Sequence, residues 1–243
     1  MRIAIVSDVH GNFAALQAVA ADLDRQSVDE VLVGGDLAQG GRQPAEVLEF
    51  LSARGWPAVL GNADQFLLRF FDGPPPLADP FAASGQWAAA RLRPNHVAYL
   101  QGLPELIRRR APSGIRFALV HATPWSITDV VLPDAPEEVA QRMLAAAHAD
   151  VLAYGHIHTA YQRRVGEGLL LSAGAVGGSN DQDPRPAYLI VNLTPPVTVE
   201  VRRVTYDVDA EIAALEREGY PLERHRAESM RTGGPWPVRT PSA

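Results

Sequence analysis

The stretch Ile3-Ala4-Ile5-Val6-Ser7-Asp8-Val9-His10-Gly11-Asn12 decides the fold of this chain and the position of its chemistry. Its first four residues are apolar and predict a buried strand, and Gly11 permits a sharp turn soon after it. Side chains two residues apart on an extended segment share a face, so Asp8 and His10 point the same way just beyond that strand. A carboxylate and an imidazole placed together in this way are suitable metal ligands.

Four further motifs repeat this arrangement, with ligand-type residues directly after an apolar run. They are Gly34-Gly35-Asp36, Gly61-Asn62-Ala63-Asp64, Val120-His121-Ala122-Thr123-Pro124 and Gly155-His156-Ile157-His158. In open α/β sheets, binding sites form beyond the carboxyl ends of the strands. We therefore expect seven side chains to meet in one crevice as metal ligands: Asp8, His10, Asp36, Asn62, His121, His156 and His158.

This mixture of imidazole, carboxylate and amide ligands suits divalent first-row metals such as manganese, iron, nickel or zinc. A single carboxylate can bridge two ions about 3.5–4 Å apart, and such a pair generates hydroxide near neutral pH. The motifs therefore predict a hydrolase that cleaves a phosphate ester with a hydroxide bridging two divalent metal ions. The chain contains no cysteine, which excludes thiolate ligands and a cysteine nucleophile.

The motifs resemble those of the calcineurin-like metallophosphoesterases, in particular their small prokaryotic phosphodiesterase branch. The resemblance runs from Met1 to about Thr205, and the Gly174–Gly177 and Asp183–Arg185 stretches add less specific support. It implies that one ion takes Asp8, His10, Asp36 and His158, and that the other takes Asp36, Asn62, His121 and His156. We further expect the catalytic side chains Asn62 and His121 to lie near the phosphate.

The third motif departs from the family pattern at Ala63. The family usually places a histidine here, held by the following acidic residue, and assigns it to the leaving group. Alanine cannot donate a proton, and general acid catalysis is typically worth about 10²–10⁴-fold. The departure therefore favours diester over monoester hydrolysis. Two alternatives stay open: a non-catalytic protein-binding scaffold on the same fold, and a hydrolase of dinucleotide polyphosphates or protein phosphates.

Other polar and aromatic residues near the motifs have two readings each. Asn12 either caps the following helix or contacts the substrate phosphate. Asp64 is predicted to be the N-cap of a helix that starts at Gln65. Trp125 either stacks on a base or aryl group of the substrate or anchors the core. His96 is predicted to be an ordinary helix residue, with a displaced general acid as the alternative.

The order of the patterns predicts alternating strands and helices followed by a strand-rich half. Strands are expected at 2–7, 30–33, 57–60, 117–120, 151–154, 159–165, 168–172, 186–193 and 197–205. Helices are expected at 13–26, 44–54, 81–101, 136–147 and 209–218, with a surface loop at 74–76. As in the resembled family, we expect an α/β fold of two facing mixed β-sheets flanked by helices, an αββα sandwich.

Composition limits the class of protein. A chain of 243 residues with 47% hydrophobic and 21% charged residues fits one globular domain over 1–243, with 206–243 as a C-terminal helix and tail. Apolar runs are too short for a membrane span, and Met1 leads almost directly into the first strand, so we expect cytoplasmic residence. The net charge of −6 argues against a broad nucleic-acid surface but allows a small phosphodiester or nucleotide-like substrate.

Overall fold

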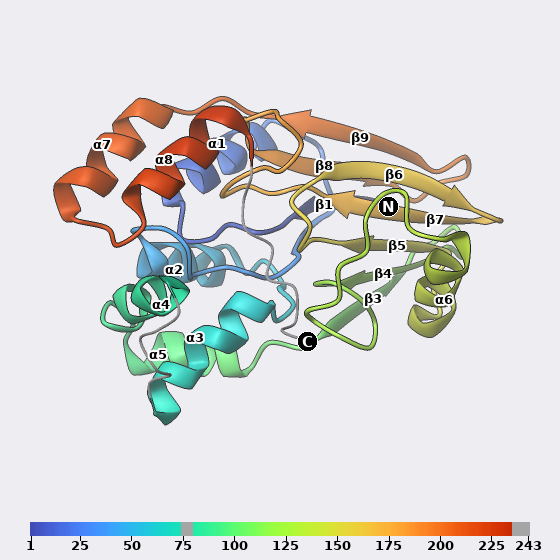
Figure 1. Cartoon of the computed structure of the whole chain (residues 1–243). Coiled ribbons are helices and arrows are strands. Elements are labelled where there is room, and N and C mark those ends of the chain that lie inside the picture. The colour runs from blue at the N-terminus through green and yellow to red at the C-terminus, as the bar shows by residue number, and fades with distance from the viewer. Residues whose placement is uncertain (74–79, 235–243) are drawn as a thin grey trace.

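The computed structural model describes residues 1–73 and 80–234, so the loop predicted at 74–76 lies outside the described residues (Figure 1). The strands are β1 (Arg2–Val6), β2 (Glu30–Val33), β3 (Leu106–Arg110), β4 (Arg116–Val120), β5 (Val151–Tyr154), β6 (Ala160–Val165), β7 (Gly168–Ala173), β8 (Ala187–Asn192) and β9 (Thr198–Arg203). The helices are α1 (Phe13–Leu23), α2 (Pro44–Arg54), α3 (Asn62–Asp72), α4 (Pro80–Ala89), α5 (Pro94–Gln101), α6 (Glu137–Ala147), α7 (Val208–Glu218) and α8 (Glu223–Thr232).

The described strands form two mixed sheets. The first has the order β2-β1-β8-β9, and the second has the order β3-β4-β5-β7-β6. Neighbouring strands run parallel in β1–β2, β4–β5 and β5–β7, and antiparallel in the remaining pairs. Two mixed sheets flanked by helices confirm the predicted αββα sandwich.

The apolar residues of β1, β4, β5, β7 and β8 are buried on both faces of their sheets, which explains why these strands read as largely continuous apolar runs. In β1, Ile3 and Ile5 face the second sheet and pack with residues such as Phe117 and Leu119 of β4. Ala4 of the same strand faces the opposite way, toward a cluster that includes residues of α1 and α2. Burial of each large apolar side chain contributes about 1.5–3 kcal/mol to stability. The two sheets are therefore held face to face by their own strand sequences.

Helices cover the outer faces of the two sheets. Residues of α1 and α2 pack on the first sheet, and residues of α6 pack on the second. In Figure 1, α6 lies at the opposite end of the molecule from the other helices. Helices α7 and α8 form a separate small cluster of buried apolar residues, with the partly buried Trp87 of α4 against it.

Three predictions about the central elements were wrong in detail. The apolar run at 57–60 makes only an isolated bridge between Ala58 and Val33, because the chain turns at Gly61 to begin α3. Strand β3 at 106–110 was not predicted, since its three arginines hide the apolar alternation of an edge strand. The single helix expected at 81–101 is two helices, α4 and α5, and the second begins at Pro94.

The C-terminal region contains one helix more than expected. Helix α7 corresponds to the helix predicted at 209–218, whereas residues 223–232 were assigned to the tail and form α8. The α8 sequence is mostly polar, but Ala227 and Met230 are buried against α7. Within the described residues, none of the helices combines the length and the apolar character that crossing a bilayer requires.

Candidate metal centre

Strand direction brings the predicted ligands to one end of the sandwich. Strands β1 and β2 are parallel, so Asp8 and Asp36 follow strands that end at the same sheet edge. Strands β4 and β5 are also parallel, which places His121, His156 and His158 at the corresponding edge of the second sheet. The His156 N–H donates to Oδ2 of Asp8 at 3.0 Å, so a direct hydrogen bond joins the two groups of ligands.

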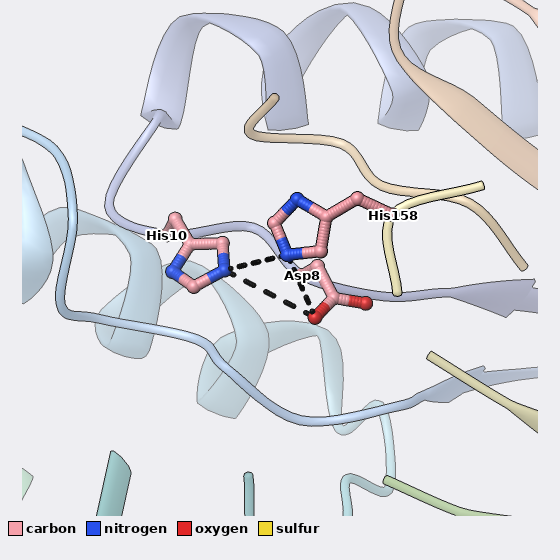
Figure 2. A group of neighbouring side chains, drawn as sticks. All are labelled: Asp8, His10 and His158. Atoms are coloured by element: carbon pink, nitrogen blue, oxygen red, sulfur yellow. Dashed lines mark hydrogen bonds and ion pairs between the residues drawn. The ribbon is translucent and has the colours of Figure 1, made fainter. Parts of the chain in front are cut away.

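Asp8, His10 and His158 form the first cluster, and their side chains point toward one another (Figure 2). Nε2 of His158 lies 3.3 Å from Oδ1 of Asp8, and Nε2 of His10 lies 4.0 Å from the same oxygen. The two Nε2 atoms are 3.1 Å apart. All three side chains are buried. The first cluster thus gathers one carboxylate and two imidazoles around a common point.

Asp36, His121 and His156 form the second cluster, whose ligand atoms lie within 4.8 Å of one another. Oδ1 of Asp36 is 3.5 Å from Nε2 of His121, and Oδ2 of Asp36 is 3.5 Å from Nε2 of His10. The carboxylate of Asp36 therefore lies between the two clusters. Oδ1 of Asn62 lies 2.8 Å from Nε2 of His121. The structure thus brings all seven predicted ligands together.

Backbone carbonyls orient three of the imidazoles. Nδ1 of His10 lies 2.7 Å from the Gln39 carbonyl, and Nδ1 of His158 lies 2.5 Å from the Gly178 carbonyl. Nδ1 of His121 has the same relation to the Gly34 carbonyl, at 2.7 Å. A carbonyl can only accept, so each Nδ1 carries a proton, and in the neutral form of such a ring Nε2 presents a lone pair. A histidine that binds a metal commonly has this arrangement.

The lone pairs on Nε2 fit a bound cation. Burial, together with the neighbouring His158, holds the pKa of His10 well below its usual value, so its ring is neutral. The Nε2 atoms of His10 and His158 face each other at 3.1 Å, an arrangement that a cation between them would stabilise. Nε2 of His156 is buried and has no hydrogen-bond partner within the described part of the chain. Burial and His121 lower the pKa of His156 to about 3, so this imidazole is also neutral and ready to ligate.

The carboxylates of the two clusters have opposite pKa shifts. Burial opposes the ionisation of Asp8, but the neighbouring His158 imidazole, whose Nε2 lies 3.3 Å from Oδ1 of Asp8, outweighs it and holds the pKa of Asp8 below its usual range. Burial and the neighbouring Asp8 raise the pKa of Asp36 to about 8. Two buried carboxylates cannot both ionise cheaply without compensating positive charge. Divalent ions would supply that compensation.

The ligand backbone is strained at most positions. Seven described residues other than glycine have positive φ, and five of them are predicted ligands: Asp8, His10, Asp36, His156 and His158. Each such conformation costs about 1–3 kcal/mol and persists where the surrounding structure enforces it. The strained turns direct the side chains that follow the strand ends toward the site. The ligands are therefore brought together at a cost in local stability.

A family comparison agrees with this geometry. A family model described as the calcineurin-like phosphoesterase superfamily domain matches residues 1–195. The chain belongs to this superfamily. The resemblance seen in the motifs is confirmed, and membership indicates a metal-dependent phosphoesterase.

Similar proteins support the same assignment. The uncharacterized protein MJ0912 of Methanocaldococcus jannaschii is 26% identical over 227 residues, which cover 85% of this chain and 88% of that protein. The crystal structure of a metallophosphoesterase from Sphaerobacter thermophilus has 25% identity and a TM-score of 0.76, and the match covers 96% of this chain and all of that one. The crystal structure of the hypothetical protein PH1004 from Pyrococcus horikoshii OT3 has 17% identity and a TM-score of 0.84, and the match covers 96% of this chain and 98% of that one. At this identity the likeness supports the fold only.

In this phosphoesterase, Asn12 and Asp64 both make contacts at helix starts. Oδ1 of Asn12 accepts the Ala15 N–H at 3.1 Å, which makes Asn12 the N-cap of α1. Asp64 is not an N-cap, because α3 begins at Asn62 and Asp64 is its third residue. Its buried carboxylate accepts from the Gly61 N–H at 3.2 Å, the reciprocal contact of a capping box, and also from the backbone of the turn after β2.

Two other candidates are not members of the ligand clusters. His96 is buried in the first turn of α5, where its Nδ1 accepts the Arg93 N–H at 3.2 Å. Trp125 is 37% exposed and is therefore not a core anchor. Its indole N–H donates to Asp129 at 2.8 Å, and the Arg142 guanidinium lies 4.0 Å from the ring centroid. These contacts hold the indole at the surface of the loop that follows His121.

Sequence reasoning missed the groups that orient the ligands. Gly34, Gln39 and Gly178 contribute only backbone carbonyls, and no side-chain pattern marks a carbonyl acceptor. It also missed Arg226, a buried residue of α8 that contacts the Gly177 carbonyl. The spacing of Arg226 and Met230, four residues apart, could have indicated a buried helix face.

Proposed function

We propose that this chain is a dinuclear metal-dependent phosphodiesterase that acts on a small phosphodiester or nucleotide-like substrate. The observation that carries the proposal is the pair of buried clusters with the Asp36 carboxylate 3.5 Å from an imidazole of each. Two bound divalent ions would supply Lewis-acid polarisation of the phosphate and a hydroxide nucleophile near neutral pH. Superfamily membership supports the same chemistry.

The two clusters suggest how the ligands divide. Asp8, His10 and His158 would hold one ion, and His121 and His156, with Asn62, would hold the other. Asp36 would bridge them. Asn62 and His121 would also contact the phosphate. The Asn62 side chain is only partly buried, and its amide oxygen lies beside Nε2 of His121, so a substrate can reach both. Manganese is the metal we propose to test first, because it accepts both imidazole and carboxylate ligands.

Ala63 is the basis for a diester rather than a monoester substrate. Its backbone N–H donates to Oδ1 of Asp36 at 2.8 Å, which fixes the residue beside the proposed bridge. Its methyl group cannot protonate a leaving alkoxide, and the neighbouring Asp64 uses its carboxylate on backbone N–H groups instead. Diesters with good leaving groups depend least on an acid at this position.

We also propose that Trp125 stacks on a base or aryl group of the substrate, and that Asn12 lies close to its phosphate. Trp125 occupies the tight turn between Thr123 and Ser126, directly after the proposed ligand His121. Its fixed and partly exposed ring offers an aromatic surface at low entropic cost. Trp125→Leu should weaken binding of a dinucleoside diester several-fold and leave binding of dimethyl phosphate, which has no base or aryl group, unchanged. An equal change for both substrates would contradict the stacking role.

The decisive test compares bis(p-nitrophenyl) phosphate with p-nitrophenyl phosphate. Metal-stripped protein is refilled with Mn²⁺, and Asp36→Ala is assayed beside His148→Ala, a control at an exposed histidine that also has positive φ. We expect metal-dependent cleavage of the diester, its loss in Asp36→Ala, and its retention in His148→Ala. Much faster cleavage of the monoester would refute the diester assignment.

A protein-binding scaffold on the same fold is a second candidate, which Ala63 favours and the complete ligand set disfavours. Protein that binds two Mn²⁺ ions but cleaves neither ester would support the scaffold. A third candidate is a hydrolase of dinucleotide polyphosphates or protein phosphates. Release of inorganic phosphate from a phosphopeptide, or cleavage of a dinucleoside polyphosphate in preference to simple diesters, would support that activity instead.

A further inference from the structure

The segment Gly177–Gly178 contacts two members of the first cluster. The Gly177 N–H donates to the backbone carbonyl of Asp8 at 2.8 Å, and the Gly178 carbonyl lies 2.5 Å from Nδ1 of His158. A Cβ atom on Gly177 would meet the Val9 carbonyl oxygen at 2.3 Å, so only glycine allows this close approach. The positions of Gly177 and Gly178 therefore help to fix the positions of the ligand atoms of Asp8 and His158.

Helix α8 reaches this segment with a buried cation. Arg226 is 1% exposed, and its Nη2 donates to the Gly177 carbonyl at 3.1 Å. Nδ2 of Asn12 lies 3.5 Å from the same carbonyl and also donates to the Tyr206 hydroxyl at 3.1 Å. One carbonyl thus receives contacts from the turn after β1 and from α8.

A second contact ties the same loop to the end of α8. The Gln182 N–H donates to the Gly233 carbonyl at 2.9 Å. Two residues before Gln182 in the same loop, the Asn180 N–H donates to the carbonyl of His158 at 2.9 Å. Residues 206–233 lie beyond the 1–195 range that the family model matches. The C-terminal region nevertheless hydrogen-bonds to the loop that contains Gly178, whose carbonyl contacts the candidate ligand His158.

We propose that Arg226 is a positioning residue for the first metal site, acting through the Gly177 carbonyl on Asp8 and His158. This inference rests on the proposed metal-binding function. A charged donor makes a shorter and stronger hydrogen bond to a carbonyl than a neutral donor does. Removing a group that orients a metal ligand typically weakens metal affinity about 10–100-fold. Arg226 acts one contact further from the ion, so we expect about 10-fold.

The effect should be specific to the first site, because the second cluster takes its backbone contacts from other segments. Nδ1 of His121 lies 2.7 Å from the Gly34 carbonyl, and Oδ1 of Asp36 accepts the Ala63 N–H at 2.8 Å. Neither contact involves the Gly177–Gly178 segment or α8. A general loss of folding would weaken both sites equally, whereas positioning by Arg226 weakens only the first.

The test measures Mn²⁺ affinity by calorimetry in two backgrounds of the full chain. His156→Ala removes a ligand of the second site and reports on the first, and His10→Ala does the reverse. Arg226→Met is introduced into each background, with Arg226→Lys as the conservative variant. Arg224→Met is the matched control, because Arg224 lies on the same helix with its side chain 98% exposed. Circular dichroism of each metal-free protein checks the fold.

We expect Arg226→Met to weaken binding about 10-fold in the His156→Ala background and to leave it unchanged in the His10→Ala background. Arg226→Lys should recover part of the loss, and Arg224→Met should have no effect. If Arg226→Met does not fold, Tyr206→Phe should weaken the first site alone, by a smaller factor. Equal loss at both sites, or none at either, overturns the positioning role. Wild-type protein that binds no Mn²⁺ would instead refute the proposed function.

Discussion

Replacing Asp36 with asparagine should stabilise the metal-free protein and remove its response to metal. Asp36 is buried, and its carboxylate oxygens lie 3.5 Å from Nε2 of His10 and of His121. Burial and the neighbouring Asp8 raise its pKa from 3.8 to about 8. The amide oxygen of asparagine can still accept the Ala63 N–H, so the variant removes the charge and keeps the local hydrogen bond.

The sign of the pH dependence follows from that pKa. Between pH 3.8 and about 8, folded metal-free protein keeps a proton on Asp36 that the unfolded chain has released. Its stability therefore falls as pH rises through this window, and the non-titrating variant lacks that slope. A shift of four pKa units corresponds to about 5–6 kcal/mol. Because repulsion between Asp36 and Asp8 is a property of the pair, we assign roughly half of this to Asp36 as the stability gain of the variant at pH 8.

Metal should reverse the order of stability. At a free Mn²⁺ concentration 1,000 times the Kd, binding stabilises wild-type protein by about 4.1 kcal/mol, which exceeds the gain expected for the variant, and the variant has lost the proposed bridge. The assay is urea unfolding followed by circular dichroism at pH 6 and pH 8, with either a chelator or Mn²⁺ present. A variant that is less stable than wild type at pH 8 without metal, or that is equally stabilised by Mn²⁺, would refute this account of Asp36.

Three further substitutions test separate parts of the structure. Ala63→His should raise cleavage of alkyl relative to aryl phosphate esters by up to about 10²-fold, and Ala63→Gln should not; equal ratios would exclude an acid at this position. His96→Ala should leave turnover unchanged across pH, because His96 caps the first turn of α5, and an altered pH–rate profile would contradict this. Arg202→Met should move acid unfolding to higher pH. The hydrogen bond from Arg202, despite opposing burial, holds the pKa of Asp22 at about 2, so about 1–2 kcal/mol of stability is present above pH 3.8 and lost as pH falls toward 2. An unchanged acid midpoint would show that the ion pair contributes nothing.

The agreement between sequence and structure is best where one element carries its own signal. Strand β1 and the ligands that follow it are contiguous, so apolar periodicity and ligand type can be read together. Strand β3 was missed because Ile107 is its only apolar residue besides Leu106, and the rest of the strand is arginine. The run at 57–60 resembles a strand in its apolar content, but that content does not reveal that the chain turns at Gly61 to begin α3 after a single bridge to Val33.

The amino-acid sequence was enough to name the seven candidate ligands, because each is a polar residue close to a short apolar run. The fold class and the superfamily followed from the resemblance of these motifs to a known family. Tertiary structure alone decided which ligands share a cluster, since strand order and parallel pairing place residues more than a hundred positions apart in contact. It also decided the tautomers of the imidazoles and the role of α8. Carbonyl acceptors and a buried arginine act through non-local contacts, and a local pattern does not name the partner in such a contact.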